Sequence, residues 1–212
     1  MTLTPSFVTQ CRVHWPIVVI SVLIITPELI LQASDAGWVG SRRWRHLAYT
    51  YGGFWTGLLG DWRPNYLLQP FAMFFSYSFL HAGLGHLLGN FGVLIWLGHT
   101  ACTHLRPWHV LGLYAGAVLG GALAFAALSA TFSPMVGASG AIFGLAGAWV
   151  VWTWQDQPNA RAAWVYAFQM VTLVIALNAV TWGLQGGQLA WETHLGGFVV
   201  GAALAWALPR KV

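Results

Sequence analysis

Long runs of apolar residues constrain the fold of this chain more than any other feature of its sequence. A helix needs roughly 20 apolar residues to cross the hydrocarbon core of a bilayer. Six runs come close to this length, at residues 14–34, 83–104, 108–130, 139–155, 163–183 and 192–209. Because backbone polar groups in lipid must hydrogen-bond within their own segment, these runs should be helices. The sequence therefore predicts an all-α membrane protein with six transmembrane helices.

The composition agrees with a lipid environment. Of 212 residues, 58% are hydrophobic and only 7% are charged, whereas soluble domains carry about 25% charged residues. The basic residues behind the net charge of +4 are scattered near the expected helix ends, so the expected partner is the lipid bilayer and not nucleic acid. The first run, preceded by Arg12, could be a signal peptide, but its length and the lack of an A-x-A site favour a spanning helix.

The segment 35–80 is a different kind of element. It is too polar in places to span a membrane, and its tryptophans and arginines are unusual for a solvated loop. Such a composition is typical of the membrane interface, so we expect an interfacial first loop here, with room for a short re-entrant helix at 47–60.

Lys and Arg predict the orientation of the spans, because they are more frequent on the inner side of a membrane. With the N-terminus inside, the basic residues on the inner side are Arg12, Arg106, Arg161, Arg210 and Lys211. The short outer loops 131–138 and 184–191 then contain no basic residue, although the first outer loop contains four arginines. Short loops carry most of the signal, so we expect both termini inside.

In this orientation, three alternate spans begin at the same depth near the outer surface, and each begins with polar residues. His81, His86 and Asn90 lie at the start of the second span, Ser139 at the start of the fourth and His194 at the start of the sixth. Ionisable and polar side chains inside a membrane usually mark a functional site. We therefore expect these residues to meet.

Small residues predict which helices approach closely. The fourth span has Gly140 and Gly144 four residues apart, and the sixth has Gly197 and Gly201. Small-xxx-small faces of this kind let helix backbones come together in lipid. Packing these two faces should bring the Ser139 hydroxyl to the His194 imidazole, although a lone Gly-x-Ser-Gly or GxxxG pattern is usually structural.

The chemistry that these residues offer is nucleophilic catalysis. A serine hydroxyl becomes a good nucleophile when a neutral histidine takes its proton. His86 and Asn90, on one helical face, and the Ser139 amide can donate to an oxyanion. Neither Glu192 nor Asp156 is suitably placed to complete a triad, so we expect a Ser–His dyad. His81 is expected to be structural, whereas Glu28 has no explanation from the sequence.

The pattern His81-x4-His86-x3-Asn90, Gly137-x-Ser139-Gly140 and His194-x2-Gly197-x3-Gly201 resembles that of the rhomboid intramembrane serine proteases. The resemblance implies a single transmembrane domain at 1–212, with a six-helix catalytic core at about 80–209. It implies Ser139 as nucleophile, His194 as base, and His86, Asn90 and the Ser139 amide around the oxyanion. It also implies that the enzyme cleaves membrane-anchored proteins in or beside a transmembrane segment, without metal or cofactor.

The family pattern also suggests roles for other positions. Gly137 should leave room for the bend and the substrate backbone, and Phe143 stands where a tyrosine often stacks on the base. Residues 163–183 and 184–191 would correspond to the helix and loop that gate the site. The Trp-Arg pair common in the first loop of the family is replaced by Ala72-Met73. The six-span form suggests a bacterial cytoplasmic membrane, with the active site towards the outer face.

Other functions remain alternatives. A rhomboid-like protein that binds transmembrane segments without cleaving them is one, but such relatives usually lack the nucleophile or the base. A small transporter would need buried charge along a pathway, and the apolar spans offer only Glu28. A zinc protease of the His-Glu-x-x-His type is excluded, because that motif does not occur.

Overall fold

The computed structural model of the protein describes residues 14–211, and within that range its secondary structure is helical. Phe54 and Met135 form an isolated antiparallel bridge between two loops. Arg12, which entered the orientation and signal-peptide arguments, lies outside the described residues. The helices are α1 (Trp15–Asp35), α2 (Trp44–Gly52), η1 (Thr56–Leu59), α3 (Gln69–Ser76), η2 (Tyr77–Phe79), α4 (Leu84–His104), α5 (Pro107–Leu128), α6 (Ser139–Gln155), α7 (Ala160–Leu184) and α8 (Trp191–Ala207).

The all-helical prediction is confirmed, and each of the six apolar runs is a helix close to its expected bounds. In the described part of the chain, α1, α5 and α7 are long and apolar enough to cross a membrane. A fourth candidate is the pair Gln69–Phe79 and Leu84–His104, bent by 79°. Helices α6 and α8 have 17 residues each, which gives a length of about 26 Å against a hydrocarbon core of about 30 Å. Six complete spans therefore remain a prediction.

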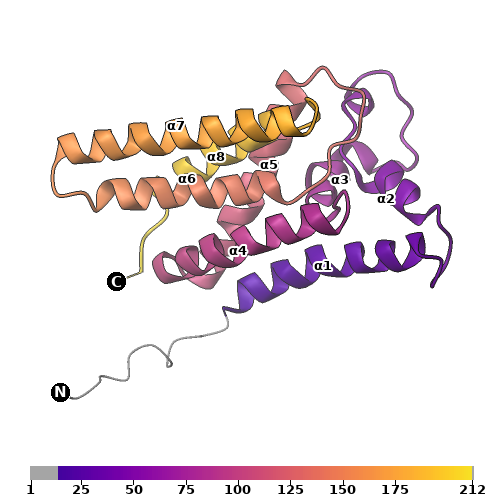
Figure 1. Ribbon diagram of the computed structural model, residues 1–212, viewed down its shortest axis with the longest axis horizontal. Helices are drawn as coiled ribbons and strands as arrows, with labels where there is room; N and C mark the ends of the chain where they lie inside the picture. Colours follow the sequence, from indigo (N-terminus) through magenta and orange to yellow (C-terminus); the bar gives the residue numbers. More distant parts are fainter. Residues whose placement is uncertain (1–13, 212) are drawn as a thin grey trace, which may run out of the picture.

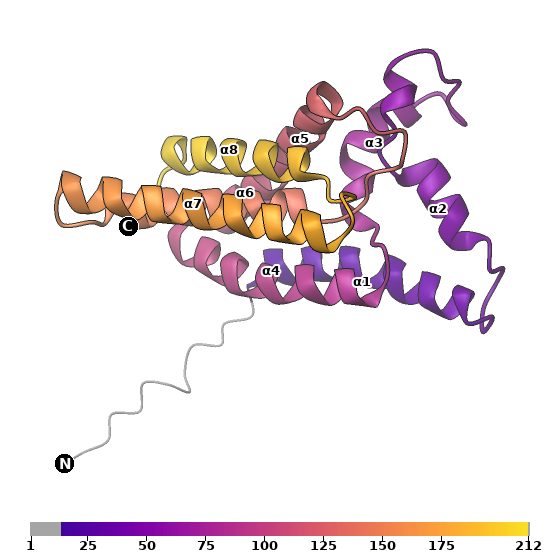
Figure 2. The ribbon, with the colours of Figure 1, turned by 45° about the horizontal axis from the view of Figure 1, so that its top comes forward.

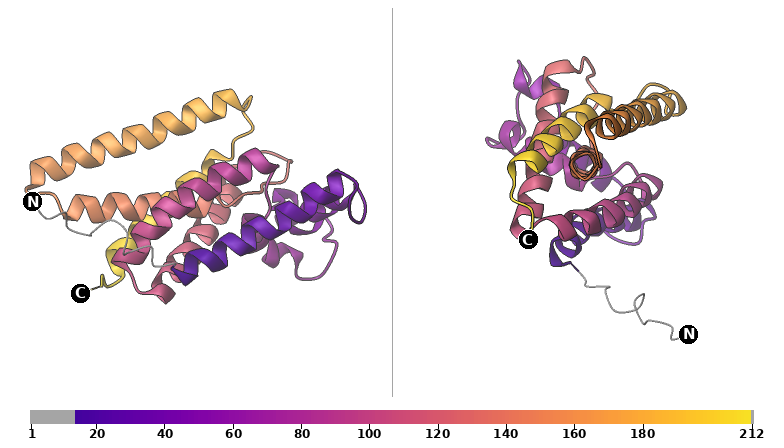
Figure 3. Two further views of the ribbon diagram at one scale, coloured as in Figure 1. Left: turned by 60° about the horizontal axis from the view of Figure 1, so that its bottom comes forward. Right: turned by 90° about the vertical axis from the view of Figure 1, so that its left-hand side faces the viewer.

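The direction of the helices gives the molecule two different ends. Helices α4, α6 and α8 begin at the end where α2 and α3 lie, whereas α1, α5 and α7 run the opposite way (Figure 1). Helix α7 lies on the outside of the bundle (Figure 3), and Ala163 is its one buried residue. The expected alignment of three helix starts is thus present in the structure.

Glycines bring α5, α6 and α8 into backbone contact, and α6 packs most extensively on α8. A Cβ atom at Gly197 would collide with the carbonyl oxygen of Gly140, and one at Gly201 with that of Gly144. A Cβ at Gly196 would collide with the carbonyl oxygen of Gly120 on α5. The small-residue faces therefore allow the close packing that was expected of them.

The segment between α1 and α4 contains the short helices α2, η1, α3 and η2, which lie together at one end of the bundle (Figure 2). Phe54 anchors this segment, because its buried ring packs edge-on against Phe74, Tyr77 and Phe125. Helix α2 falls partly within the expected 47–60 helix. The position of this segment at the membrane interface remains a prediction.

Candidate active site

Ser139 and His194 lie within hydrogen-bonding distance of each other. The distance from Ser139 Oγ to His194 Nε2 is 2.8 Å. Ser139 is the first residue of α6, and His194 lies in the first turn of α8. The glycine contacts between these two helices start one residue after Ser139, at Gly140. The close crossing of α6 and α8 therefore sets the distance between the hydroxyl and the imidazole.

Two further residues hold the imidazole of His194. Its Nδ1 lies 2.6 Å from Oδ1 of Asn178 on α7. The Phe143 ring stacks on it with centroids 4.0 Å apart and an interplanar angle of 5°. If Nδ1 carries the proton and donates it to Asn178, Nε2 is free to accept the proton of the serine hydroxyl.

Sequence reasoning missed Asn178. The signal was there, because an amide within the apolar run 163–183 needs a hydrogen-bond partner in lipid. The partner could not be identified, since the sequence does not say which face of α7 meets α8. Neither acid considered for a triad contacts the ring. Asp156 pairs instead with Arg210 at the far end of α6.

His86 and Asn90 present hydrogen-bond donors beside Ser139. The Ala82 N–H donates to His86 Nδ1 at 3.3 Å, so the other ring nitrogen, Nε2, carries the hydrogen. Asn90 Nδ2 is buried and has no hydrogen-bond partner. The Ser139 N–H belongs to the first turn of α6 and has no partner within the helix. The structure thus places three donors near the serine.

Gly137 marks the space between these donors. A Cβ atom built there would lie 3.0 Å from His86 Nε2 and 3.8 Å from Asn90 Nδ2. Its φ angle of 133° is one that side-chain-bearing residues rarely adopt. Glycine therefore satisfies two needs at this position, the turn into α6 and the room in front of the donors.

Two cavities meet at the imidazole of His194. One, of about 880 Å³, is lined by Ser139, His194, His86 and Asn90 together with the loops 129–137 and 185–191. The other, of about 680 Å³, is an almost wholly apolar groove between α7 and α8 that reaches Phe143 and His194. The site is thus accessible from the larger cavity, which has a mixed polar and apolar lining, and from an apolar groove.

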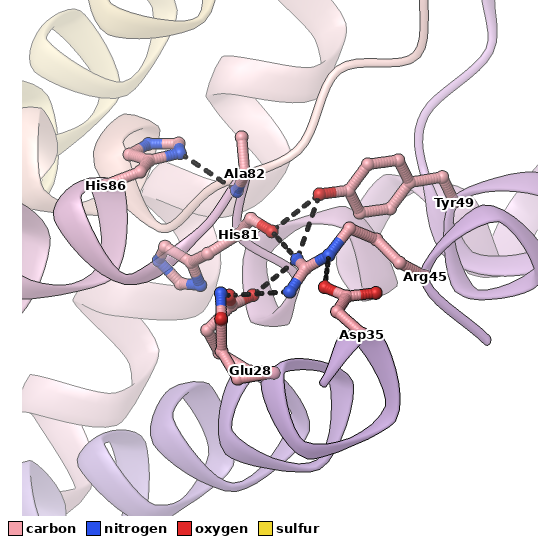
Figure 4. A network of polar contacts seen from close by, with 8 residues as sticks. Glu28, Asp35, Arg45, Tyr49, His81, Ala82 and His86 are labelled. Carbon is pink, nitrogen blue, oxygen red and sulfur yellow. Dashed lines mark hydrogen bonds and ion pairs between the residues drawn. The ribbon is translucent and has the colours of Figure 1, made fainter. Parts of the chain in front are cut away.

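His81 and Glu28 are both fully buried. The His81 ring lies edge-on to the His86 ring, with centroids 5.1 Å apart. Glu28 pairs with Arg45 on α2 at 2.9 Å, and Arg45 also bonds Asp35 (Figure 4). The hydrogen bond to Glu28 raises the pKa of Arg45 above its ordinary value, so Arg45 remains charged. Among residues 14–211, no group of three or more His, Cys, Asp or Glu could hold a metal ion.

These features define an integral membrane protein with a serine–histidine site at one end of a helical bundle. The family model described as "Rhomboid domain" matches residues 68–211, more than half of the chain. The chain therefore belongs to the rhomboid family of intramembrane serine proteases. It is 36% identical over 88 residues to Rhomboid-related protein 1 of Caenorhabditis elegans. That match covers 40% of this chain and 24% of the relative, so the chain spans about a quarter of that protein's length.

Proposed function

We propose that this protein is an intramembrane serine endopeptidase that cleaves membrane-anchored proteins in or beside a transmembrane segment. The observation that carries the proposal is the 2.8 Å contact between Ser139 Oγ and His194 Nε2. The bond from Nδ1 to Asn178 supports it, because a base held by a third group is the usual arrangement around an activated serine.

The first half of the reaction forms an acyl-enzyme. Ser139 Oγ attacks the scissile carbonyl carbon while His194 Nε2 takes the hydroxyl proton. The negative charge on the carbonyl oxygen is stabilised by the Ser139 N–H, His86 Nε2–H and Asn90 Nδ2–H. His194 then gives its proton to the leaving amine as the peptide bond breaks. No metal or cofactor is needed in this step.

The second half regenerates the enzyme. Water from the larger cavity attacks the acyl carbon, and His194 Nε2 accepts one of its protons. The ester bond to Ser139 breaks, the proton returns to Oγ, and the new carboxyl end leaves. The larger cavity that contacts Ser139 supports this step, because it is lined in part by polar side chains and hydrolysis needs water below the membrane surface.

The apolar groove supports a transmembrane segment as substrate. Its lining residues come from α6, α7 and α8, and it reaches the imidazole of His194. A hydrophobic segment in this groove would bring its end to Ser139 from the side of the membrane. Helix α7 and the loop 185–190 are the elements that would move to admit it.

The remaining parts of the proposal concern the membrane. We place all six apolar helices across a bacterial cytoplasmic membrane, with both termini inside and the site near the outer face. Residues 1–212 then form one domain, with a catalytic core at about 80–209 and an interfacial loop at 35–80. His81 and the glycines at 137, 140, 197 and 201 act as supporting residues.

A membrane-anchored reporter in liposomes tests the proposal. We expect the wild-type protein to cleave the reporter, and Ser139→Ala to abolish cleavage. Ser133→Ala is the matched control, because Ser133 lines the same cavity and should leave cleavage unchanged. The product mass should place the cut near the outer end of the reporter's span.

Three outcomes would contradict parts of the proposal. Equal cleavage by Ser139→Ala and wild type would remove Ser139 as the nucleophile. A reporter that binds but stays intact would favour a rhomboid-like binding protein. A cut near the inner end of the span would contradict the outward position of the site.

A further inference from the structure

An ion pair between partly exposed Arg45 and buried Glu28 connects α2 to α1. Arg45 NH1 and NH2 each lie 2.9 Å from an oxygen of Glu28, whose side chain is 0% exposed. Gln32 donates to the same carboxylate at 2.7 Å. Arg45 also donates to Asp35 through Nε at 2.6 Å. A planar guanidinium held on two sides in this way has little freedom to turn.

The held guanidinium reaches a backbone carbonyl beside the site. Arg45 NH1 donates to the His81 carbonyl oxygen at 3.0 Å, and the Tyr49 hydroxyl donates to the same oxygen at 2.7 Å. Both donors come from α2, as Figure 4 shows. The carbonyl of His81 is therefore fixed in direction by two hydrogen bonds from another element.

The peptide group between His81 and Ala82 also orients the imidazole ring of His86. The carbonyl oxygen of His81 and the N–H of Ala82 belong to one planar unit, so holding one sets the direction of the other. The Ala82 N–H donates to His86 Nδ1 at 3.3 Å. This bond puts the ring hydrogen of His86 on Nε2, which faces the space in front of Gly137. Hydrogen bonds to the carbonyl also polarise the peptide and strengthen its N–H as a donor.

We propose that Tyr49, and Arg45 anchored by Glu28, are positioning residues for the oxyanion donor His86. They act through the peptide between His81 and Ala82. The proposal rests on the proteolytic function given above. Glu28, Arg45 and Tyr49 all lie outside the residues 68–211 that match the family. The interfacial segment thus contributes to the catalytic step, in addition to tying α1 to α2.

Tyr49→Phe is the mildest test, because it removes one donor to the His81 carbonyl and leaves the Glu28–Arg45 pair in place. We expect kcat to fall about threefold to tenfold with KM unchanged, since the interaction matters in the transition state. Tyr66→Phe is the matched control. It removes a similar hydroxyl bond, to the Tyr51 carbonyl in the same segment, and should leave kcat unchanged.

Arg45→Lys is the stronger test. A lysine keeps the charge but cannot bond both Glu28 and the His81 carbonyl in the fork geometry of arginine. We expect about a tenfold loss of kcat. Arg210→Lys is the matched control, because Arg210 also bonds a carboxylate and a backbone carbonyl, those of Asp156 and Trp152, at the other end of the bundle.

A double-mutant cycle separates positioning from structural support. If Tyr49 acts through His86, Tyr49→Phe should cause no further loss of kcat in a His86→Ala background. Multiplied losses, or a kcat of Tyr49→Phe equal to wild type, would overturn the proposal. Absence of Ser139-dependent cleavage in the wild type would instead contradict the proposed function.

Nitrogen chemical shifts of His86 provide a readout that does not need activity. In the wild type we expect the tautomer with hydrogen on Nε2, assigned by loss of the signal in His86→Ala. In Tyr49→Phe we expect a shift towards a mixture of tautomers. Identical His86 shifts in Tyr49→Phe and wild type would overturn the proposal.

Discussion

The imidazole of His194 has a defined contact on each polar atom and on one face. Nε2 contacts the serine hydroxyl, Nδ1 contacts the Asn178 oxygen, and the Phe143 ring covers one side. An amide oxygen can hold the ring and select its tautomer, but it adds no negative charge to stabilise the imidazolium. In the proposed mechanism, Asn178 therefore orients the base, and the dyad carries out the proton transfer.

Asn178→Ala should lower kcat by about 10- to 100-fold, because the ring loses the partner that selects the productive tautomer. Asn178→Asp keeps an acceptor oxygen and should retain more activity than the alanine variant. Both are measured as kcat on a membrane-anchored reporter. Wild-type kcat in Asn178→Ala would show that Phe143 and packing are enough to orient His194.

Gly137→Ala tests the space in front of the oxyanion donors. The alanine methyl group would lie 2.8 Å from His86 Cε1. The alanine backbone would also have to adopt a φ of 133°, which side-chain-bearing residues rarely do. We expect a loss of kcat of about 100-fold or more. Gly92→Ala is the control, because a Cβ at Gly92 meets nothing within 4 Å. Equal activity of Gly137→Ala and wild type would mean that the oxyanion lies elsewhere.

At the scale of elements, the crossing of α6 and α8 determines the geometry of the dyad. Gly201→Ala would place a methyl group on the Gly144 carbonyl and push the two helices apart. We expect a destabilisation of about 1–3 kcal/mol, together with reduced cleavage, as measured by unfolding in detergent and by reporter assay.

The matched control for this crossing is Gly112→Ala on α5, where a Cβ meets nothing within 4 Å. It should be neutral, or stabilising by about 0.5–1 kcal/mol, because glycine is a poor helix former. If Gly201→Ala unfolded like Gly112→Ala, close contact between α6 and α8 would not be important for stability.

In the proposed mechanism, helix α7 and its groove determine which substrates reach Ser139 and His194. Ala179 lines the apolar groove and not the larger cavity. Ala179→Phe should slow cleavage of a transmembrane reporter several-fold but leave labelling of Ser139 by a small serine-directed probe unchanged. Ala176→Phe, one turn earlier and lining neither cavity, should change neither rate. If Ala179→Phe slowed reporter cleavage and probe labelling equally, the groove would not be the substrate route.

The helices and the contact between Ser139 and His194 could be predicted from the sequence, because both depend on local patterns. Apolar length specified the helices, and small residues at matched spacing specified which of them would bring Ser139 to His194. The partners of Glu28 and Asn178 could not be predicted in this way. Glu28 meets Arg45 through an irregular segment, and Asn178 depends on the rotation of α7, a helix that is exposed over most of its length.

At the scale of the whole molecule, the three helices that carry the site begin at one end of the bundle (Figure 1). The positive ends of α4, α6 and α8 therefore point towards the region of the dyad, which favours a developing negative charge there. The opposite end is closed by bonds from the C-terminal residues, with Arg210 on Asp156 and the Lys211 N–H on the His104 carbonyl. The candidate site and the contacts of the C-terminal residues thus lie at different ends of the bundle.

The central claim is that His194 activates Ser139 as a nucleophile, and covalent labelling measures this most directly. The wild-type protein in liposomes is treated with a fluorophosphonate, digested and analysed by mass spectrometry. We expect one adduct on Ser139, its absence in Ser139→Ala, and labelling of His194→Ala slowed by about 100-fold or more. An unlabelled Ser139 in the wild type, or equal labelling rates in His194→Ala and wild type, would contradict the claim.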